Sequence, residues 1–268
     1  MKATWQGYVT IGQLTIPVRL YGATKTIRPR FTRLHEKDNS PTEQAVKCQA
    51  EGKEIPNSET IRAAESEPGS YVVISDEELE RTAATRLKSI EVRQFCDVSA
   101  IDPIYYEKPY YVVPSKGGER AYALLREVLV RGNKVAIVQF VLYNKEHLGA
   151  LQVRQDIIVL HQMRFAAEIV PRTDIDTPPL PQPNPAEIGA ALAVLQRLSG
   201  PFFVEDYHDE QSERLLDLIT RKKKGLPPPR RRIVSPHATP DQELLAALRA
   251  TLESKRQLSI EDAVEEDG

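Results

Sequence analysis

Cysteine and long apolar runs are both scarce in this sequence. Cys48 and Cys96 are its two cysteines, too few for a disulfide framework, and no charged and then apolar signal stretch opens the chain. We therefore expect a reducing, cytoplasmic environment. No window approaches the roughly 18 uninterrupted apolar residues of a transmembrane helix, so a membrane partner is not expected.

The residue patterns of common catalytic and cofactor sites are missing as well. None of the 13 glycines stands in a Walker or dinucleotide-binding spacing after a predicted strand, which argues against nucleotide hydrolysis. The five histidines are scattered, without a second histidine or a cysteine at ligand spacing. Cys48, followed by Glu51 and Gly52, resembles part of a zinc knuckle, but a closed site needs three more ligands that are not nearby. We predict no catalytic residue, no metal and no cofactor, and hence a protein that is not an enzyme.

The chain has no large excess of positive or negative charge, with a formal net charge of -2, but the two signs are unevenly distributed along the sequence. Counting Lys and Arg against Asp and Glu gives six alternating blocks: +6 for 1–37, -8 for 38–107, +5 for 108–172, -7 for 173–213, +7 for 214–232 and -5 for 233–268. Such blocks allow one positive face on a nearly neutral protein, as a polyanion site requires. Ordinary solvated charge is the alternative interpretation.

The first 170 residues are rich in β-strand patterns. Runs of β-branched and aromatic residues predict strands at 4–10, 14–21, 71–74, 90–95, 110–113, 134–143, 147–153 and 156–162. The strand at 71–74 is expected to be buried and to precede a short helix that Ser75 and Glu78 cap. Short polar links make neighbouring strands antiparallel, which favours a barrel or a sandwich over a doubly wound sheet.

One helix interrupts the strands. Residues 119–131 carry an apolar stripe at helical spacing, and Gly132 ends it. The residues of this stripe are Ala121, Leu124, Leu125, Val128 and Leu129.

The chain changes character after residue 170. Prolines concentrate in 171–186, which indicates a semi-rigid linker. Helices are predicted at 185–198 and 205–223, and a last one runs through Leu244, Leu248 and Leu252 after a cap at Thr239–Gln242. The predicted fold is mainly β with α appendages: an antiparallel β-barrel core at 1–170 with a polar bridge segment at about 25–70, the linker, a helical arm at 187–225 and a tail at 226–268.

Basic residues are the remaining candidates for function. Few aromatic residues stand among them, so contact with a duplex backbone is a better match than base stacking on single strands. The first set is Lys25, Arg28, Arg30, Arg33 and Lys37, and the second is Lys116, Arg120, Arg126, Arg131 and Lys134. Without a helix-turn-helix or zinc-finger spacing, base readout is not expected.

Eight blocks in order resemble one family, the bacterial Ku proteins of non-homologous DNA end joining. The match runs from Trp5-Gln6-Gly7 to the end of the predicted arm. The other blocks include FTRLHEKDN at 31–39, YVVISDEEL at 71–79, Ile101-Asp102-Pro103, Glu107–Tyr111, Ala121–Glu127, Glu146-His147-Leu148 and, in the arm, Tyr207-His208-Asp209 with Glu213–Ile219.

The resemblance implies a homodimer whose barrels and bridge segments close a ring around double-stranded DNA. A free end alone can thread such a ring, so no sequence specificity is needed. If about 30 residues of the bridge segment form a two-stranded ribbon, its strands reach about 50 Å. Half a ring around a duplex needs roughly 40 Å.

The resemblance also implies that the arm holds the dimer together and recruits the pathway's ATP-dependent DNA ligase. Candidate arm contacts are Tyr207, Leu215, Leu216 and Ile219. A nucleoid-associated location follows from this function. The chain departs from its relatives at Glu51, where many carry a cysteine, and in its tail, where Arg230–Arg232 replace a long Lys-rich extension.

Two other classes stay open at this point. A general basic-patch DNA-binding protein, or a protein scaffold, would share the charge pattern without any preference for DNA ends. A nuclease or lyase would need a metal-holding carboxylate cluster or a reactive amine, and the acidic residues here concentrate at helix starts and in loops.

Overall fold

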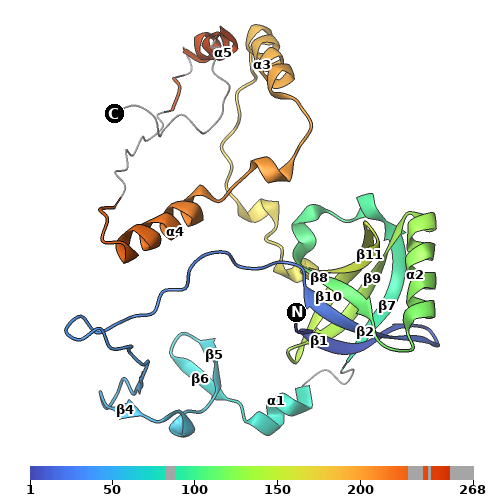
Figure 1. Ribbon diagram of the computed structural model, residues 1–268, viewed down its shortest axis with the longest axis vertical. Helices are drawn as coiled ribbons and strands as arrows, with labels where there is room; N and C mark the ends of the chain where they lie inside the picture. The colour runs from blue at the N-terminus through green and yellow to red at the C-terminus, as the bar shows by residue number, and fades with distance from the viewer. Residues whose placement is uncertain (83–87, 229–237, 241–242, 254–268) are drawn as a thin grey trace. The chain divides into compact units, whose positions relative to one another are not determined.

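The computed structural model describes residues 1–82, 88–228, 238–240 and 243–253 of the chain (Figure 1). It divides into two compact units, Met1–Ile175 and Asp176–Gly268. Arg230–Arg232 and the Asp241–Gln242 part of the predicted last cap lie outside the described residues. No helix in the described part of the chain is both long and apolar enough to cross a membrane.

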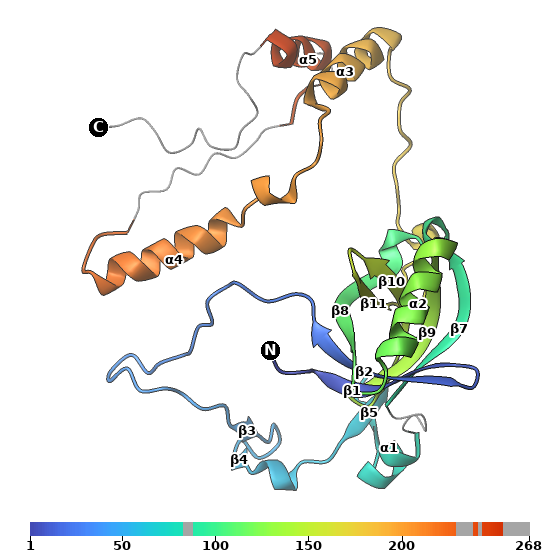
Figure 2. The same ribbon diagram turned by 45° about the vertical axis from the view of Figure 1, so that its right-hand side comes forward.

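The first unit is built on a closed barrel of seven strands, which confirms the predicted barrel core. Their order around the barrel is β1-β2-β8-β11-β10-β9-β7. The strands are β1 (Trp5–Ile11), β2 (Leu14–Gly22), β7 (Ser89–Asp97), β8 (Tyr106–Pro114), β9 (Lys134–Leu142), β10 (Lys145–Arg154) and β11 (Ile157–Met163). Figure 2 shows the barrel turned by 45°.

The prediction of an antiparallel barrel is wrong at one seam. Six neighbouring pairs are antiparallel, but β1 and β7 run parallel, with Tyr8 opposite Ser89 and Thr10 opposite Glu91. Strand directions can alternate all the way around a closed ring only if the number of strands is even. With seven strands, at least one pair must be parallel.

A single apolar cluster fills the barrel. Every barrel strand contributes to it, for example Val9 of β1, Leu20 of β2 and Leu160 of β11, each at most 1% exposed. These residues alternate with outward-facing ones, because successive side chains of a strand point to opposite faces.

Helix α2 (Glu119–Gly132) packs against the barrel beside β9 and β10 and adds Tyr122, Leu125 and Leu129 to the cluster. The Tyr122 hydroxyl donates to the Val112 carbonyl at 2.8 Å and accepts the Ile158 N–H at 2.9 Å, and so joins β8 to β11.

The predicted apolar stripe of this helix is partly wrong. Leu124 and Val128 are 60% and 53% exposed. The sequence allows two overlapping stripes on this helix, and the one through Tyr122 faces the barrel.

Between β2 and β7 the chain forms no barrel strand. It contains two short hairpins, β3 (Val46–Lys47) with β4 (Glu54–Ile55) and β5 (Ala63–Glu67) with β6 (Ser70–Val73), followed by α1 (Asp76–Thr82). The structure therefore has separate hairpins in place of one long ribbon. None of residues 24–82, all of which the structure describes, is buried.

The expected burial of the strand at 71–74 is wrong, while the cap that follows it is confirmed. Tyr71, Val72 and Val73 are 66%, 53% and 56% exposed, because among the described residues β6 forms a separate two-stranded sheet with β5 and is not part of the barrel. The Ser75 N–H donates to the Glu78 carboxylate at 2.9 Å, and the Glu78 N–H donates to the Ser75 hydroxyl at 3.2 Å.

The second unit is helical, with α3 (Pro185–Leu198), α4 (Glu210–Lys223) and α5 (Leu244–Glu253). Helix α4 begins at 210 and not at 205, because the Asp209 carboxylate accepts the N–H of Ser212 at 3.1 Å and caps the helix there. Helix α5 packs against α3, and the Arg197 guanidinium of α3 donates to the carbonyls of Thr251 and Leu252.

Candidate nucleic-acid interface

The first set of basic residues lies in one extended stretch directly after β2, which we call the basic segment (residues 25–37). The segment has no regular secondary structure beyond one isolated bridge between Leu34 and Pro41. All five of its basic side chains are exposed: Lys25, Arg28, Arg30, Arg33 and Lys37. An extended chain with cations at intervals is suited to follow a row of phosphates.

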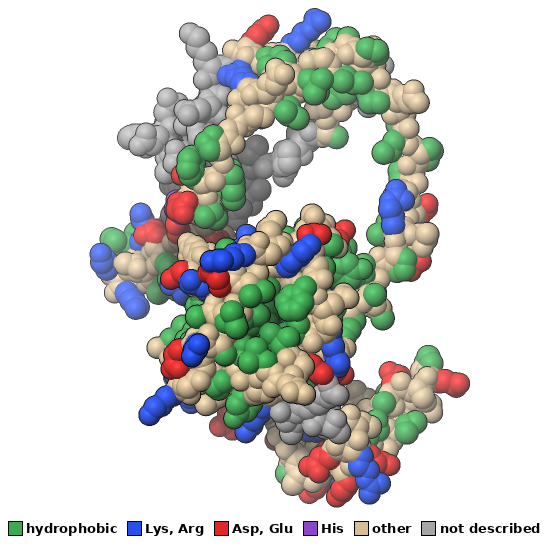
Figure 3. All heavy atoms as spheres, turned by 90° about the vertical axis from the view of Figure 1, so that its right-hand side faces the viewer, with side chains coloured by type: hydrophobic (Ala, Val, Ile, Leu, Met, Phe, Trp, Pro, Cys, Tyr) green, Lys and Arg blue, Asp and Glu red, His purple; other side chains and the backbone are tan. Residues whose placement is uncertain are grey.

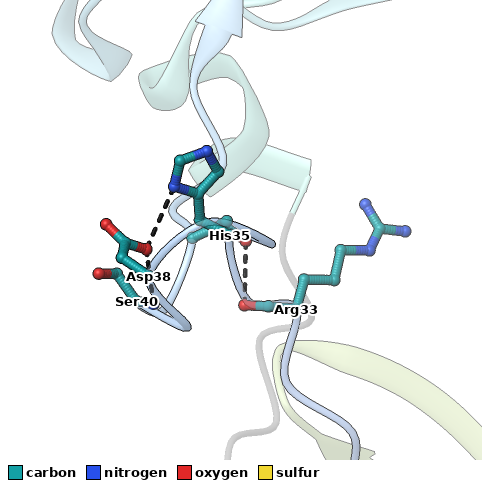
Figure 4. Close-up of polar contacts among 5 residues, drawn as sticks. Arg33, His35, Asp38 and Ser40 are labelled. Atoms are coloured by element: carbon teal, nitrogen blue, oxygen red, sulfur yellow. Dashed lines mark hydrogen bonds and ion pairs between the residues drawn. The ribbon is translucent and has the colours of Figure 1, made fainter.

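A compact turn closes the basic segment (Figure 4). The Thr42 N–H donates to the Arg33 carbonyl at 3.1 Å and the His35 N–H to the Ser40 carbonyl at 2.8 Å. The Asp38 carboxylate accepts the N–H of Ser40 at 3.0 Å and lies 3.1 Å from the His35 ring nitrogen. In Figure 4 the Arg33 guanidinium points away from the His35–Asp38 pair.

The carboxylate of this turn does not neutralise its arginine. The Ser40 backbone N–H lowers the pKa of Asp38, with smaller help from the Ser40 side chain and His35, so Asp38 is ionised at neutral pH. Its partners are Ser40 and His35, and Arg33 makes no ion pair with any described residue. The positive charge of Arg33 is thus directed into solvent.

The second set of basic residues lies on α2 and its flanking loops, and three of its members are engaged. Arg126 donates to the Asp156 carbonyl at 3.0 Å. Arg131 pairs with Glu127 at 2.8 Å, and Lys134 pairs with Asp97 at 2.7 Å.

Lys116 and Arg120 differ from these three, because they are exposed and form no ion pair with a described residue. Within this set, the uncompensated charge lies at the start of α2.

The two sets of basic residues follow barrel strands that end at opposite ends of the barrel. Strands β2 and β8 are antiparallel neighbours, with Gly22 opposite Tyr110 and Val18 opposite Pro114. The basic segment follows the end of β2, whereas α2 follows the end of β8. The topology alone therefore does not merge the two sets into one continuous patch.

Hydrophobic side chains also gather on the barrel unit. Figure 3 faces the side that carries α2 and shows such a group with Lys and Arg side chains around it. Leu124 and Val128 of α2 are among the exposed apolar residues. Both belong to the predicted apolar stripe of this helix, and sequence patterning did not identify an exposed apolar surface there.

The candidate arm residues occupy α4 and the turn before it. Tyr207 is 69% exposed and its ring centroid lies 5.4 Å from that of Phe202. Leu216 is 46% exposed, while Leu215 and Ile219 are half-buried. Two arginines of α4 are paired along the helix, Arg214 with Glu210 and Arg221 with Asp217, each at 2.8 Å. The apolar side of α4 is therefore partly open.

The described residues hold no group of three or more His, Cys, Asp or Glu that could bind a metal ion. Cys48 lies in the β3–β4 turn, where its N–H donates to the Lys53 carbonyl and its own carbonyl accepts the Gly52 N–H, both at 2.9 Å. His161 of β11 stacks edge-on against Tyr106 at 5.2 Å. Burial, assisted by the charge of Arg154, lowers the pKa of His161.

Comparison with known proteins agrees with the barrel topology. The family described as the Ku70/Ku80 beta-barrel domain matches residues 10–190. The non-homologous end joining protein Ku of Symbiobacterium thermophilum is 34% identical over 257 residues, which are 94% of this chain and 63% of that protein. The chain thus spans less than two thirds of this relative.

Two further relatives are matched over most of their length. Non-homologous end joining protein Ku 1 of Geotalea uraniireducens is 35% identical over 229 residues, which are 85% of this chain and 87% of that protein. The non-homologous end joining protein Ku of Archaeoglobus fulgidus is 33% identical over 257 residues, which are 95% of this chain and 99% of that protein.

Proposed function

The chain belongs to the Ku family, and from this membership we propose that it binds the ends of double-stranded DNA, without sequence specificity, in non-homologous end joining. The relatives that match it carry end joining in their names. The observation that carries the proposal is the exposed basic segment on a Ku-type barrel.

Phosphate contact supplies the affinity in this proposal. The side chains of Arg28, Arg30, Arg33 and Lys37 are our preferred contacts, because they are exposed along an extended backbone. Lys25, Lys116 and Arg120 can add to them. Arg126, Arg131 and Lys134 contribute less, since each would first have to leave a partner within the chain. Contacts of this kind carry no sequence information.

Dimerisation is supported by the composition of the bridge segment. It has no core of its own, yet it exposes large apolar side chains such as Ile27 (65%), Phe31 (75%) and Ile61 (75%). An ordered segment without buried apolar area does not offset its loss of conformational entropy. We propose that a second copy of the chain covers these residues and that the two copies enclose the duplex as a ring.

The helical arm has a role in the proposal as a contact surface for partners. Its exposed Leu216 and Tyr207, together with half-buried Leu215 and Ile219, form a surface for the partner subunit and for an ATP-dependent DNA ligase. In this view the protein has no catalytic residues of its own. It holds and protects ends, and the ligase supplies the chemistry.

A competition between DNA forms tests the proposal. A labelled linear duplex is bound at moderate salt and challenged with equal masses of relaxed circular DNA, open linear DNA or linear DNA with hairpin caps at both ends. Open linear DNA is expected to compete far better than the other two, because a ring must be threaded. Equal competition by circles would instead indicate a general basic-patch DNA-binding protein, and no binding at low salt would indicate a protein scaffold.

A further inference from the structure

An aromatic pocket lies where the barrel closes between β1 and β7. It has a volume of about 680 Å³, within the usual range of small-ligand sites, about 300–1,000 Å³. Trp5 and Tyr8 line it from β1, Lys88 from the residue before β7, and Tyr143 and Asn144 from the turn between β9 and β10. These residues are far apart in the sequence, and none belongs to the basic sets described above.

Close packing against Gly7 holds the Trp5 side of the pocket in position. An added Cβ at Gly7 would lie 2.3 Å from the Trp5 ring and 2.2 Å from the Lys88 carbonyl. The Trp5 ring therefore covers Gly7, where no other residue type fits without displacing it. The Tyr8 N–H donates to the Lys88 carbonyl at 2.9 Å and fixes the two walls to each other.

Two tyrosine rings are left open to solvent. Tyr8 is 48% exposed and Tyr143 is 74% exposed. Tyr143 and Asn144 have φ values of 54° and 61° and make the two-residue turn between β9 and β10. Such turns favour Asn and Gly, whereas a bulky residue in the left-handed region is strained. A tyrosine in this strained conformation, with its ring exposed, is consistent with a role for the ring itself.

The charge of the pocket favours an anion. Lys88 is exposed, and no carboxylate is among the described residues that line the pocket. Glu91 and Glu146 line a separate, much smaller hollow, which shares Val141 with the pocket. A ligand with a flat aromatic face and an adjacent negative group matches these walls.

We propose that this pocket holds an unpaired nucleobase of a single-stranded overhang at a DNA end, with the neighbouring phosphate at Lys88. The inference rests on the proposed function and adds to it a means of telling overhangs from blunt ends. Bases stack on aromatic side chains without regard to sequence, because every base has a π-face. A proline-rich peptide also packs on aromatic rings, but it brings no negative group for Lys88.

The single tryptophan of the chain provides the readout, because Trp5 lines the pocket. The full-length protein is titrated with a short oligothymidylate and, separately, with a blunt duplex. Saturable quenching of Trp5 fluorescence is expected with the oligonucleotide. Tyr143→Asn removes the ring and keeps a residue suited to the turn, and Tyr8→Ala removes the second ring.

Each substitution is expected to weaken oligonucleotide binding about 5- to 150-fold, the equivalent of ~1–3 kcal/mol of stacking. Lys88→Gln is expected to lower the slope of log affinity against log salt by about 0.7 for a single strand. Tyr111→Ala serves as the matched control, since Tyr111 is a 41% exposed tyrosine on β8, outside the pocket lining.

The outcomes separate this inference from the proposed function. Unchanged oligonucleotide affinity in both tyrosine variants overturns the pocket assignment, even if blunt duplex is still bound. Quenching of Trp5 fluorescence by a proline-rich peptide but not by the oligonucleotide also overturns the assignment. A change of Trp5 fluorescence with protein concentration alone overturns it as well, because it indicates that a second copy of the chain occupies the pocket. Failure to bind any duplex end contradicts the proposed function, whereas oligonucleotide quenching that the tyrosine variants lose supports the pocket in either case.

Discussion

Replacing the four preferred cations of the basic segment is the strongest test of the phosphate-contact proposal. The variant carries Gln at Arg28, Arg30, Arg33 and Lys37. None of these residues is buried, so the barrel is expected to fold as before, and an unchanged melting temperature would establish this.

The expected magnitude follows from the number of exposed charges. Each phosphate contact contributes about 0.9 to the slope of log affinity against log salt on duplex DNA, so four lost contacts lower the slope by about 3.6. Between 50 and 200 mM salt each contact then accounts for a factor of about 3.5, and four for about 150. If both subunits of a homodimer contact one duplex, the change in slope doubles to about 7.

The assay is equilibrium binding of a blunt duplex at several salt concentrations, with two controls. Replacing the three arginines by lysine keeps the charge and is expected to keep the slope. Replacing Arg131, Arg214 and Arg221 by Gln removes three charges, one fewer than the four-Gln variant, from side chains that are ion-paired in the structure, and it is expected to change the slope little. A four-Gln variant with an unchanged slope would refute the assignment of the basic segment.

The remaining predictions concern stability. Tyr122→Phe should lower the free energy of unfolding by about 2–4 kcal/mol in urea denaturation, because the buried Val112 carbonyl and Ile158 N–H both lose their partner; a loss below about 0.5 kcal/mol would contradict this. Since burial lowers the pKa of His161, the unfolded chain binds this proton more tightly, and stability should decline as pH falls below the ordinary histidine value of about 6.5. In His161→Gln this part of the decline, measured between pH 8 and pH 5, should be absent. Arg197→Ala should raise amide exchange in α5 about fivefold, as expected for the loss of about 1 kcal/mol; exchange unchanged from the wild type would show that Arg197 does not hold α5.

The sequence by itself determined the local elements of this protein. β-branched and aromatic runs marked all seven barrel strands, and 3.6-residue spacing marked α2, because both periodicities are properties of a few successive residues. The Ser75–Glu78 cap was predictable for the same reason. The single parallel pair was not within reach, because eight strands were predicted and an even number can close with alternating directions; it follows from the seven strands that the structure places in the barrel. The order of motifs was enough to recognise the Ku family.

Only the tertiary structure decided which side chains are free and which are engaged. Lys134 and Arg126 looked like candidate phosphate contacts, but their partners are 37 and 30 residues away in the sequence. The strand at 71–74 looked like core, yet its side chains at Tyr71, Val72 and Val73 are more than half exposed. The aromatic pocket brings Trp5, Lys88 and Tyr143 together across the closure of the barrel. Local patterns carry no information on such distant pairings, because these depend on how the strands close and which face of each element the barrel covers.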